Sequence, residues 1–221
     1  NDAAGNTFTA VSGNSVTLTG EPITWKTATS GNWTDGTNWS SGTEPGAADQ
    51  AAINVSGSPY TVTVDGSDTV AALNIGDASA TLAIASSIAL TVAATSTTNG
   101  APNVISGTVQ NKGTIELQNS APSGTPIVTS ATFEGAVTNA GTISLQGAYG
   151  SGTEANADAT FESTVSNTGT IGASGGNLVF GSAGSVDNVA GAHIDVQSLL
   201  TSNHAFASSA TFEGAVTNAG T

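Results

Sequence analysis

The sequence predicts an all-β fold, a parallel β-helix in which short strands stack as successive rungs. Three observations predict it. The segment ATFEGAVTNAGT occurs twice, at 131–142 and 210–221; a motif Val-x-Asn-x-Gly-Thr-Ile recurs at a step of 28 residues; and apolar and polar residues alternate within each copy. Alternation with period two is typical of β-strands. Self-similarity over about 20 to 50 residues is typical of solenoids and repeat arrays.

The motif fixes the register of the predicted rungs. Its copies are Val109, Asn111, Gly113, Thr114 and Ile115; Val137, Asn139, Gly141, Thr142 and Ile143; Val165, Asn167, Gly169, Thr170 and Ile171; and, with one extra residue, Val186, Asn188, Gly191 and Ile194. Asn188 follows Asn167 by 21 residues, and Asn218 follows 30 residues later. Such variation is expected of a solenoid whose loops vary while its strands keep register.

Each motif position has an expected role. Asn and Gly tolerate positive φ, so we expect them at the corners between strands. Stacked asparagines are expected to form a ladder of side-chain amides, as in cross-β stacks, and the valines and isoleucines to fill the core. The predicted structural ladder comprises Asn111, Asn139, Asn167 and Asn218, with Gly113, Gly141 and Gly169. An antiparallel β-sandwich array is the alternative architecture.

The chain between residues 58 and 95 predicts further short strands, about ten residues apart. They are 60–64, 70–75, 81–84 and 88–92. Two polar, Gly-rich loops, 95–103 and 146–158, are expected to project from the solenoid. We therefore predict an N-terminal capping region, 1–57, followed by β-solenoid repeats, 58–221. We expect the repeats to continue beyond residue 221, because the second copy of the duplicated segment stops in mid-motif.

All three tryptophans, Trp25, Trp33 and Trp39, lie in the predicted capping region. Terminal units of repeat proteins are atypical, and bulky aromatic side chains can seal the first rung of a thin solenoid. In the alternative interpretation, the tryptophans stack on sugar rings, whose C–H surfaces suit the apolar faces of indole.

The N-terminal part of the chain resembles the start of a known family of β-helical regions. The resemblance lies in the order of Thr-Trp, Gly-Asn-Trp and Asn-Trp, followed by Pro-Gly-x-x-Asp and Tyr-Thr-Val-Thr-Val. The family comprises the β-helical passenger regions of large bacterial surface or secreted proteins, autotransporter-like adhesins and β-strand-repeat proteins. The Asn-x-Gly-Thr-Ile repeats resemble the same group, and the resemblance covers most of the chain. It implies a secreted or cell-surface location and a role in adhesion, matrix or envelope structure.

The negative charge of the chain excludes polyanionic partners. Sixteen acidic residues face only Lys26 and Lys112, which gives a net charge of −14. Nucleic acid is excluded as a partner, because phosphate binding depends on clustered Lys and Arg, and an anionic membrane surface is excluded for the same reason. No run of 18 apolar residues predicts membrane insertion. The chain has no Cys, hence no disulfide or thiolate chemistry.

Calcium is the one cofactor that the sequence brings into consideration. Asp65 and Asp68, in Asp-Gly-Ser-Asp, offer the hard oxygen ligands that calcium prefers and are the candidate metal residues. The EF-hand loop and the Gly-rich nonapeptide of calcium-binding β-rolls are both missing. Asp-Gly is also an ordinary turn dipeptide, which is the alternative interpretation.

Candidate catalytic residues point away from an enzyme. Glu134, Glu162 and Glu213 each follow a Phe, and adjacent rungs would place two of them about 4.8 Å apart, close to the separation in a retaining glycosidase. A catalytic pair needs environments that drive two pKa values apart, and equivalent repeat positions lack that asymmetry. We therefore expect a solvated carboxylate row. His193 and His204 form neither a recognisable zinc site nor a triad.

These inferences predict an extracellular structural or adhesive β-solenoid, part of a bacterial surface adhesin stalk or a self-assembling matrix fibre of the biofilm type. The expected partner is the protein itself, through stacking or head-to-tail assembly, because an open β-helix end exposes unpaired strand edges; the other expected partner is host or matrix carbohydrate. The alternative function is a carbohydrate-binding or carbohydrate-cleaving module.

Overall fold

The computed structural model describes residues 21–94, 103–119, 128–150, 153–200 and 205–221. Across these ranges the chain is all-β, with no α-helix and one short 3-10 turn, η1 (Gly36–Asn38). The described ranges therefore hold no helix of the length and apolarity needed to cross a membrane.

Three long parallel sheets organise the strands, and a fourth, three-stranded sheet extends one of them. The eight-stranded sheet contains, in spatial order, β2 (Gly31–Asn32), β4 (Tyr60–Val64), β7 (Ala80–Ile84), β10 (Thr108–Asn111), β13 (Val137–Asn139), β18 (Val165–Asn167), β21 (Ser185–Asn188) and β26 (Ala215–Asn218). The six-stranded sheet contains β22 (His193–Gln197), β19 (Thr170–Ser174), β14 (Thr142–Gln146), β11 (Thr114–Asn119), β8 (Ala89–Ala94) and β5 (Asp68–Val70). The five-stranded sheet contains β25 (Ser209–Phe212), β20 (Asn177–Phe180), β17 (Ala157–Phe161), β12 (Thr129–Phe133) and β9 (Asn103–Ile105). The three-stranded sheet contains β1 (Ile23–Thr24), β3 (Gln50–Ala52) and β6 (Ala72–Asn74), and an Ile75–Ile105 bridge joins it to the five-stranded sheet.

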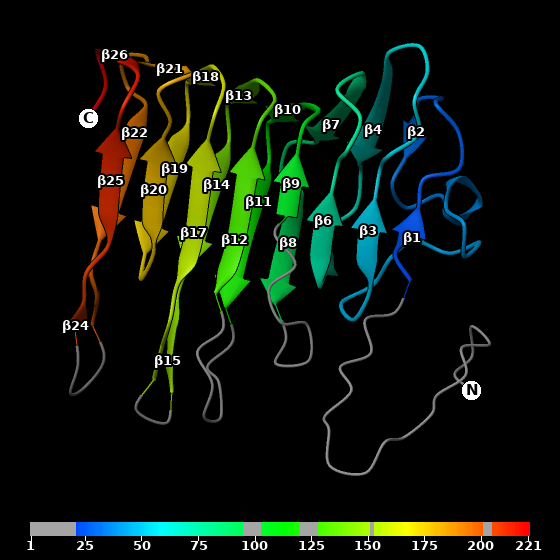
Figure 1. Cartoon of the computed structure of the whole chain (residues 1–221), viewed down its shortest axis with the longest axis horizontal. Helices are drawn as coiled ribbons and strands as arrows, with labels where there is room; N and C mark the ends of the chain where they lie inside the picture. Colours follow the sequence, from blue (N-terminus) through cyan, green and yellow to red (C-terminus); the bar gives the residue numbers. More distant parts are fainter. Residues whose placement is uncertain (1–20, 95–102, 120–127, 151–152, 201–204) are drawn as a thin grey trace.

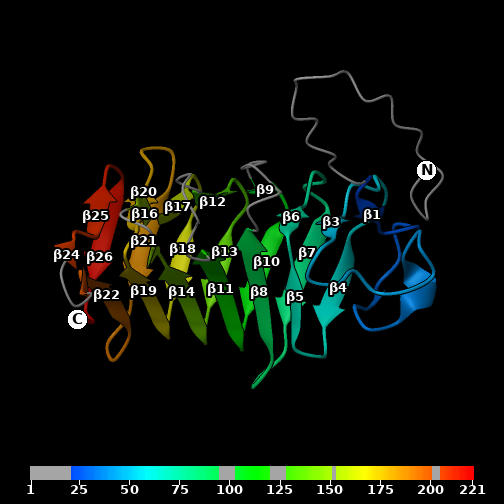
Figure 2. The ribbon, with the colours of Figure 1, turned by 90° about the horizontal axis from the view of Figure 1, so that it is seen from below.

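The chain visits the sheets in a fixed rotation, from β9 to β10 to β11 and then from β12 to β13 to β14. Each return adds a strand beside the equivalent strand of the previous circuit, so that the strands line up along one axis (Figures 1 and 2). We call one such circuit a rung. Pairing within the four sheets is parallel throughout the described ranges, so the alternative of an antiparallel sandwich array was wrong.

The predicted strands at 60–64, 81–84 and 88–92 are confirmed as β4, β7 and β8. The segment 70–75 instead turns a corner at Ala71, which separates β5 from β6. Most of the predicted loop 95–103 lies outside the described residues. The predicted loop 146–158 is partly ordered as an antiparallel hairpin of β15 (Ala148–Gly150) and β16 (Thr153–Ala155). A second hairpin joins β23 (Leu199–Leu200) to β24 (Ala205–Phe206).

Alternate side chains of most strands in the three long sheets point into one shared hydrophobic cluster. Period-two alternation puts every second residue on the inner face. The predicted apolar rows are present, since Val109, Val137 and Val165 pair in register and are buried. Ile115, Ile143 and Ile171 do the same in the six-stranded sheet.

A column of phenylalanine rings runs through the same core along the five-stranded sheet. The ring centroids of Phe133 and Phe161 lie 4.8 Å apart, those of Phe161 and Phe180 5.1 Å, and those of Phe180 and Phe212 4.8 Å. Interplanar angles of 11°, 11° and 4° make each contact a stacked one. The spacing follows the distance of about 4.8 Å between neighbouring strands.

The motif glycines occupy their positions for a different reason from the predicted one. Among the described residues, positive φ occurs at Gly42, Ser87, Gly175 and Gly191. Of the motif glycines, only Gly191 of the looser copy is among them, whereas Gly113, Gly141 and Gly169 are not. Close stacking of the rungs demands glycine there instead. A Cβ at Gly141 would collide with the carbonyl oxygen of Gly113, and a Cβ at Gly169 with that of Gly141.

Gly191 marks the extra residue of the fourth motif copy. Its φ of 85° belongs to the left-handed region that glycine adopts without a steric penalty. The backbone absorbs the insertion in this turn, and Asn188 and Ile194 still pair with Asn167 and Ile171.

We expect Gly141→Ala to lower the free energy of unfolding by about 1–3 kcal/mol, because a buried methyl would force two rungs apart. Gly172→Ala is the matched control: a Cβ there would meet only the Asp195 carbonyl oxygen, at 3.6 Å, an ordinary contact. This control is expected to stay within about 0.5 kcal/mol of the parent chain. Urea denaturation of both variants measures the difference, and equal effects would contradict the steric explanation.

Candidate functional site

The motif asparagines form one continuous amide ladder across five rungs. Each Nδ2 donates to the Oδ1 of the next asparagine: Asn111 to Asn139 at 2.7 Å, Asn139 to Asn167 at 2.8 Å, Asn167 to Asn188 at 2.7 Å and Asn188 to Asn218 at 2.8 Å. The first four of these residues are buried and Asn218 is exposed. Asn188, which the predicted ladder left out, links Asn167 to Asn218.

The ladder also ties the eight-stranded sheet to the following turn. Asn111 Nδ2 donates to the Thr142 carbonyl at 2.9 Å, and Asn139 Nδ2 to the Thr170 carbonyl at 3.0 Å. Each buried amide therefore satisfies a backbone carbonyl at the corner of the next rung, where β14 or β19 begins. At the first ladder position, Asn111 Oδ1 is buried without a hydrogen-bond partner, because Ile84 occupies the preceding rung.

The three tryptophans pack together at the β1 end of the sheets. Trp39 meets Trp25 and Trp33 edge to face, with centroids 5.0 and 4.7 Å apart. Trp39 Nε1 donates to the Trp33 carbonyl at 2.7 Å. All three are at most 1% exposed and belong to the shared core. This burial contradicts the carbohydrate-stacking interpretation, because no ring face is open to a sugar.

The predicted capping region is not separate from the sheets. β1, β2 and β3 all lie before residue 58 and pair in parallel with β3, β4 and β6. The tryptophan cluster is thus built on the first strands of the stack.

The two predicted calcium ligands, Asp65 and Asp68, accept hydrogen bonds from the segment that carries the tryptophans. Asp68 Oδ2 accepts from Trp33 Nε1 at 2.7 Å, and Asp65 Oδ1 accepts from the Thr34 backbone N–H at 3.2 Å. Burial, together with the charges of Asp68 and Asp65, raises the pKa of Glu44. Within the described ranges, no three His, Asp or Glu side chains are grouped so that they could hold a metal ion.

The calcium prediction at Asp65 and Asp68 is tested by a thermal melt with and without a chelator. A metal bound only to the folded chain would raise the melting temperature. We expect the two melting curves to coincide, because both carboxylates already accept hydrogen bonds from the tryptophan segment. A chelator-dependent fall in the melting temperature would contradict this expectation.

Two aspartates at surface turns predict how stability depends on pH. Hydrogen bonds from the Thr37 hydroxyl and backbone lower the pKa of Asp35 below its ordinary value of 3.8, and hydrogen bonds from the hydroxyls of Ser79 and Ser56 lower the pKa of Asp77 below the same value. A lowered folded-state pKa stabilises the fold above the unfolded-state value, and this stabilisation is lost as the pH falls through the folded-state value. Below pH 3.8 the melting temperature is therefore expected to fall more steeply in the parent chain than in the Asp35→Asn/Asp77→Asn variant. Parallel slopes would contradict the assignment.

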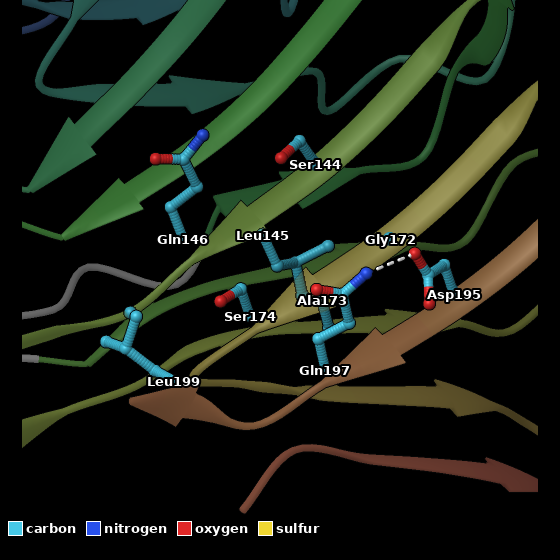
Figure 3. Close-up of a pocket in the computed structure, with 10 residues that line it drawn as sticks. Ser144, Leu145, Gln146, Gly172, Ala173, Ser174, Asp195, Gln197 and Leu199 are labelled. Atoms are coloured by element: carbon cyan, nitrogen blue, oxygen red, sulfur yellow. Dashed lines mark hydrogen bonds between the residues drawn. The ribbon is translucent and has the colours of Figure 1, made fainter. Parts of the chain in front are cut away.

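A hollow with a partly polar lining lies over the six-stranded sheet (Figure 3). It has a volume of about 360 Å³. Two polar rows cross it in register, Ser144 with Gly172 and Asp195, and Gln146 with Ser174 and Gln197. Leu199 lies at one end of the hollow, and Gln197 Nε2 donates to Asp195 Oδ2 at 2.7 Å.

Gly172 contributes no side chain to the lining of the hollow. Gly172 is needed neither for positive φ nor for close packing of the rungs, so its position leaves open space between Ser144 and Asp195. The lining provides amides, hydroxyls and one carboxylate, groups that hydrogen-bond a polar ligand. Sequence reasoning missed this site. The sequence holds one indication of it. Gly172 follows Thr-Ile in its motif copy, and the equivalent residues of the two preceding copies are Glu116 and Ser144.

The predicted carboxylate row is interrupted. Glu134 and Glu162 lie on adjacent rungs and are both exposed, and Glu134 Oε2 accepts from the Ser106 hydroxyl at 2.6 Å. Gly181 occupies the next rung, between Glu162 and Glu213. Of the two histidines, His193 is exposed and hydrogen-bonded to the Thr221 hydroxyl, and His204 lies outside the described residues.

Comparison of the chain with protein-family models, curated protein sequences and solved structures finds no match. The resemblance to β-helical passenger regions therefore stays a prediction drawn from the residues. The function has to be argued from the geometry of the chain itself.

Proposed function

We propose that this chain is a segment of an extracellular β-solenoid with a structural role, in a bacterial surface adhesin stalk or a self-assembling matrix fibre. One observation carries the proposal: like side chains stack in register from rung to rung, in the asparagine ladder and the phenylalanine column. Repetition of this kind builds length and stiffness, because each rung contacts only its neighbours.

The charge supports a solvated, exposed surface. A net charge of −14 with only two cationic side chains promotes solubility and repulsion between the flanks of neighbouring molecules. Contacts between molecules would then be confined to the ends of the stack, where unpaired strand edges lie. We accordingly propose the protein itself as the first partner and do not propose an enzymatic activity.

Binding of a carbohydrate is the second candidate function, and the polar hollow around Gly172 favours it. Sugar hydroxyls both donate and accept, and they match side chains such as Gln146, Asp195 and Gln197 that line the hollow. The tryptophans do not support this function, because they are buried.

Negative-stain imaging of the purified chain, together with a binding screen of soluble glycans, tests the proposal. We expect elongated particles of uniform width, and end-to-end fibres at high protein concentration. Compact particles that bind a glycan would contradict the structural role and favour the second candidate. Gly172→Leu separates the two functions, because it fills the hollow without touching either end of the stack. It should abolish glycan binding and leave particle shape unchanged.

A further inference from the structure

The last described rung carries the same twelve residues as an internal rung, but in a different environment. ATFEGAVTNAGT forms 131–142, which the following rung covers, and 210–221, which no described segment covers. Phe133 and Val137 are 1% and 2% exposed, whereas their counterparts Phe212 and Val216 are 42% and 45% exposed. The same apolar side chains are therefore buried in the internal copy and exposed in the last described rung.

The uncovered face combines apolar side chains with open backbone edges. β22, β25 and β26 each stand at the end of their sheet. A hollow of about 270 Å³ between Ile194, Val196, Phe212 and Val216 opens on this face. Unpaired parallel edges of this kind recruit an extended segment by adding a strand.

The rung that covers the internal copy, 131–142, shows which kind of segment fits on the last described rung. Residues 157–170, ADATFESTVSNTGT, cover the internal copy, with Phe161 on Phe133, Val165 on Val137 and Asn167 on Asn139. Asn139 Nδ2 donates to Asn167 Oδ1 at 2.8 Å. Asn218, the equivalent of Asn139, accepts from Asn188 through its Oδ1. Its Nδ2 therefore has the geometry to donate to an asparagine of an added rung.

We propose that the face formed by β25 and β26 binds an extended polypeptide segment of the rung type, Thr-Phe-x-x-x-Val-x-Asn-x-Gly-Thr, in parallel register. This inference deepens the proposed structural function and rests on it. The segment places its Phe on Phe212, its Val on Val216 and its Asn on Asn218, which extends both the phenylalanine column and the asparagine ladder by one position.

A labelled synthetic peptide with the sequence of residues 157–171 tests the proposal by fluorescence polarisation against the full 221-residue chain. We expect saturable binding that is at least tenfold weaker for Asn218→Asp. This variant keeps the acceptor for Asn188 but removes the donor to the peptide. A peptide with Phe161→Ser and Asn167→Asp is the matched control, and it should not bind. Circular dichroism melts verify that the chain variant is folded.

A disulfide readout fixes the register independently, since the chain has no cysteine of its own. Thr217→Cys in the chain should crosslink a peptide with Cys at the position of Ser166, because Thr138 pairs with Ser166 internally. A peptide with Cys at the position of Val165 should not crosslink.

Absence of saturable binding to the folded chain overturns the proposal, and so does equal binding by parent and variant. A dimer that the peptide fails to displace also overturns it, since a second copy then occupies the face in another way. Elongated particles without peptide binding would reject this inference alone, whereas compact particles would reject the proposed function itself.

Discussion

Phe161→Ala is expected to lower the free energy of unfolding by about 3–5 kcal/mol. Phe161 is one of the two interior members of the phenylalanine column, stacked on Phe133 at 4.8 Å and on Phe180 at 5.1 Å. Truncation removes buried apolar surface and both ring contacts, and neighbouring rungs held by strand pairing on both sides cannot collapse into the space. Urea denaturation followed by circular dichroism measures the change.

Phe212→Ala is the matched control, because the same residue type stacks on only one neighbour and is 42% exposed. We expect its effect to be well under half that of Phe161→Ala, since less surface is buried and no enclosed cavity forms. Equal losses for the two variants would show that the column does not stabilise the interior of the stack.

Asn139→Asp is expected to lower the free energy of unfolding by about 3–5 kcal/mol at pH 7, because a buried carboxylate without a compensating charge is strongly unfavourable. Asn139 Nδ2 is the donor to Asn167 Oδ1 and to the Thr170 carbonyl, and a carboxylate would face both acceptors. Burial raises the pKa of the new aspartate in the folded state. The destabilisation should therefore diminish as the pH falls through that raised value, where the protonated acid can donate again.

The control for this variant is Asn218→Asp, at the exposed end of the ladder. Asn218 accepts from Asn188 at 2.8 Å, and a carboxylate retains this role. Its effect on stability should be within about 0.5 kcal/mol and should depend little on pH. A loss at Asn139 that stays constant from pH 7 to pH 3 would contradict the donor role assigned to its amide.

The repeat register of this fold could be predicted from the sequence because each rung repeats the same requirements. The spacing of Asn111, Asn139 and Asn167 alone gave the pairing that the structure has. The rows of Val and Ile followed from period-two alternation. Asn188 was assigned to the looser motif copy but was left out of the predicted ladder, where its side chain joins Asn167 to Asn218 despite the inserted residue.

The features that could not be predicted from the sequence depend on contacts between residues far apart in the chain. Gly141 was assigned to a positive φ, since a single sequence shows that glycine is required and not whether backbone angle or a neighbouring rung requires it. Trp33 could be placed at the start of the stack, but its bond to Asp68 joins residues 35 apart in the chain. The hollow at Gly172 depends on three neighbouring strands and becomes visible only when they are paired.

A spin-label distance measurement tests the parallel stacking of the rungs. Thr63 and Thr217 lie in the same row of the eight-stranded sheet, six strand steps apart, and Thr63 and Ser166 are four steps apart. At about 4.8 Å per step, labels at the first pair should be about 29 Å apart and those at the second about 19 Å. Two narrow distributions that differ by about 10 Å are the predicted result. Distances that do not scale with the number of steps, or broad distributions for both pairs, would contradict the stacked fold and the structural role proposed from it.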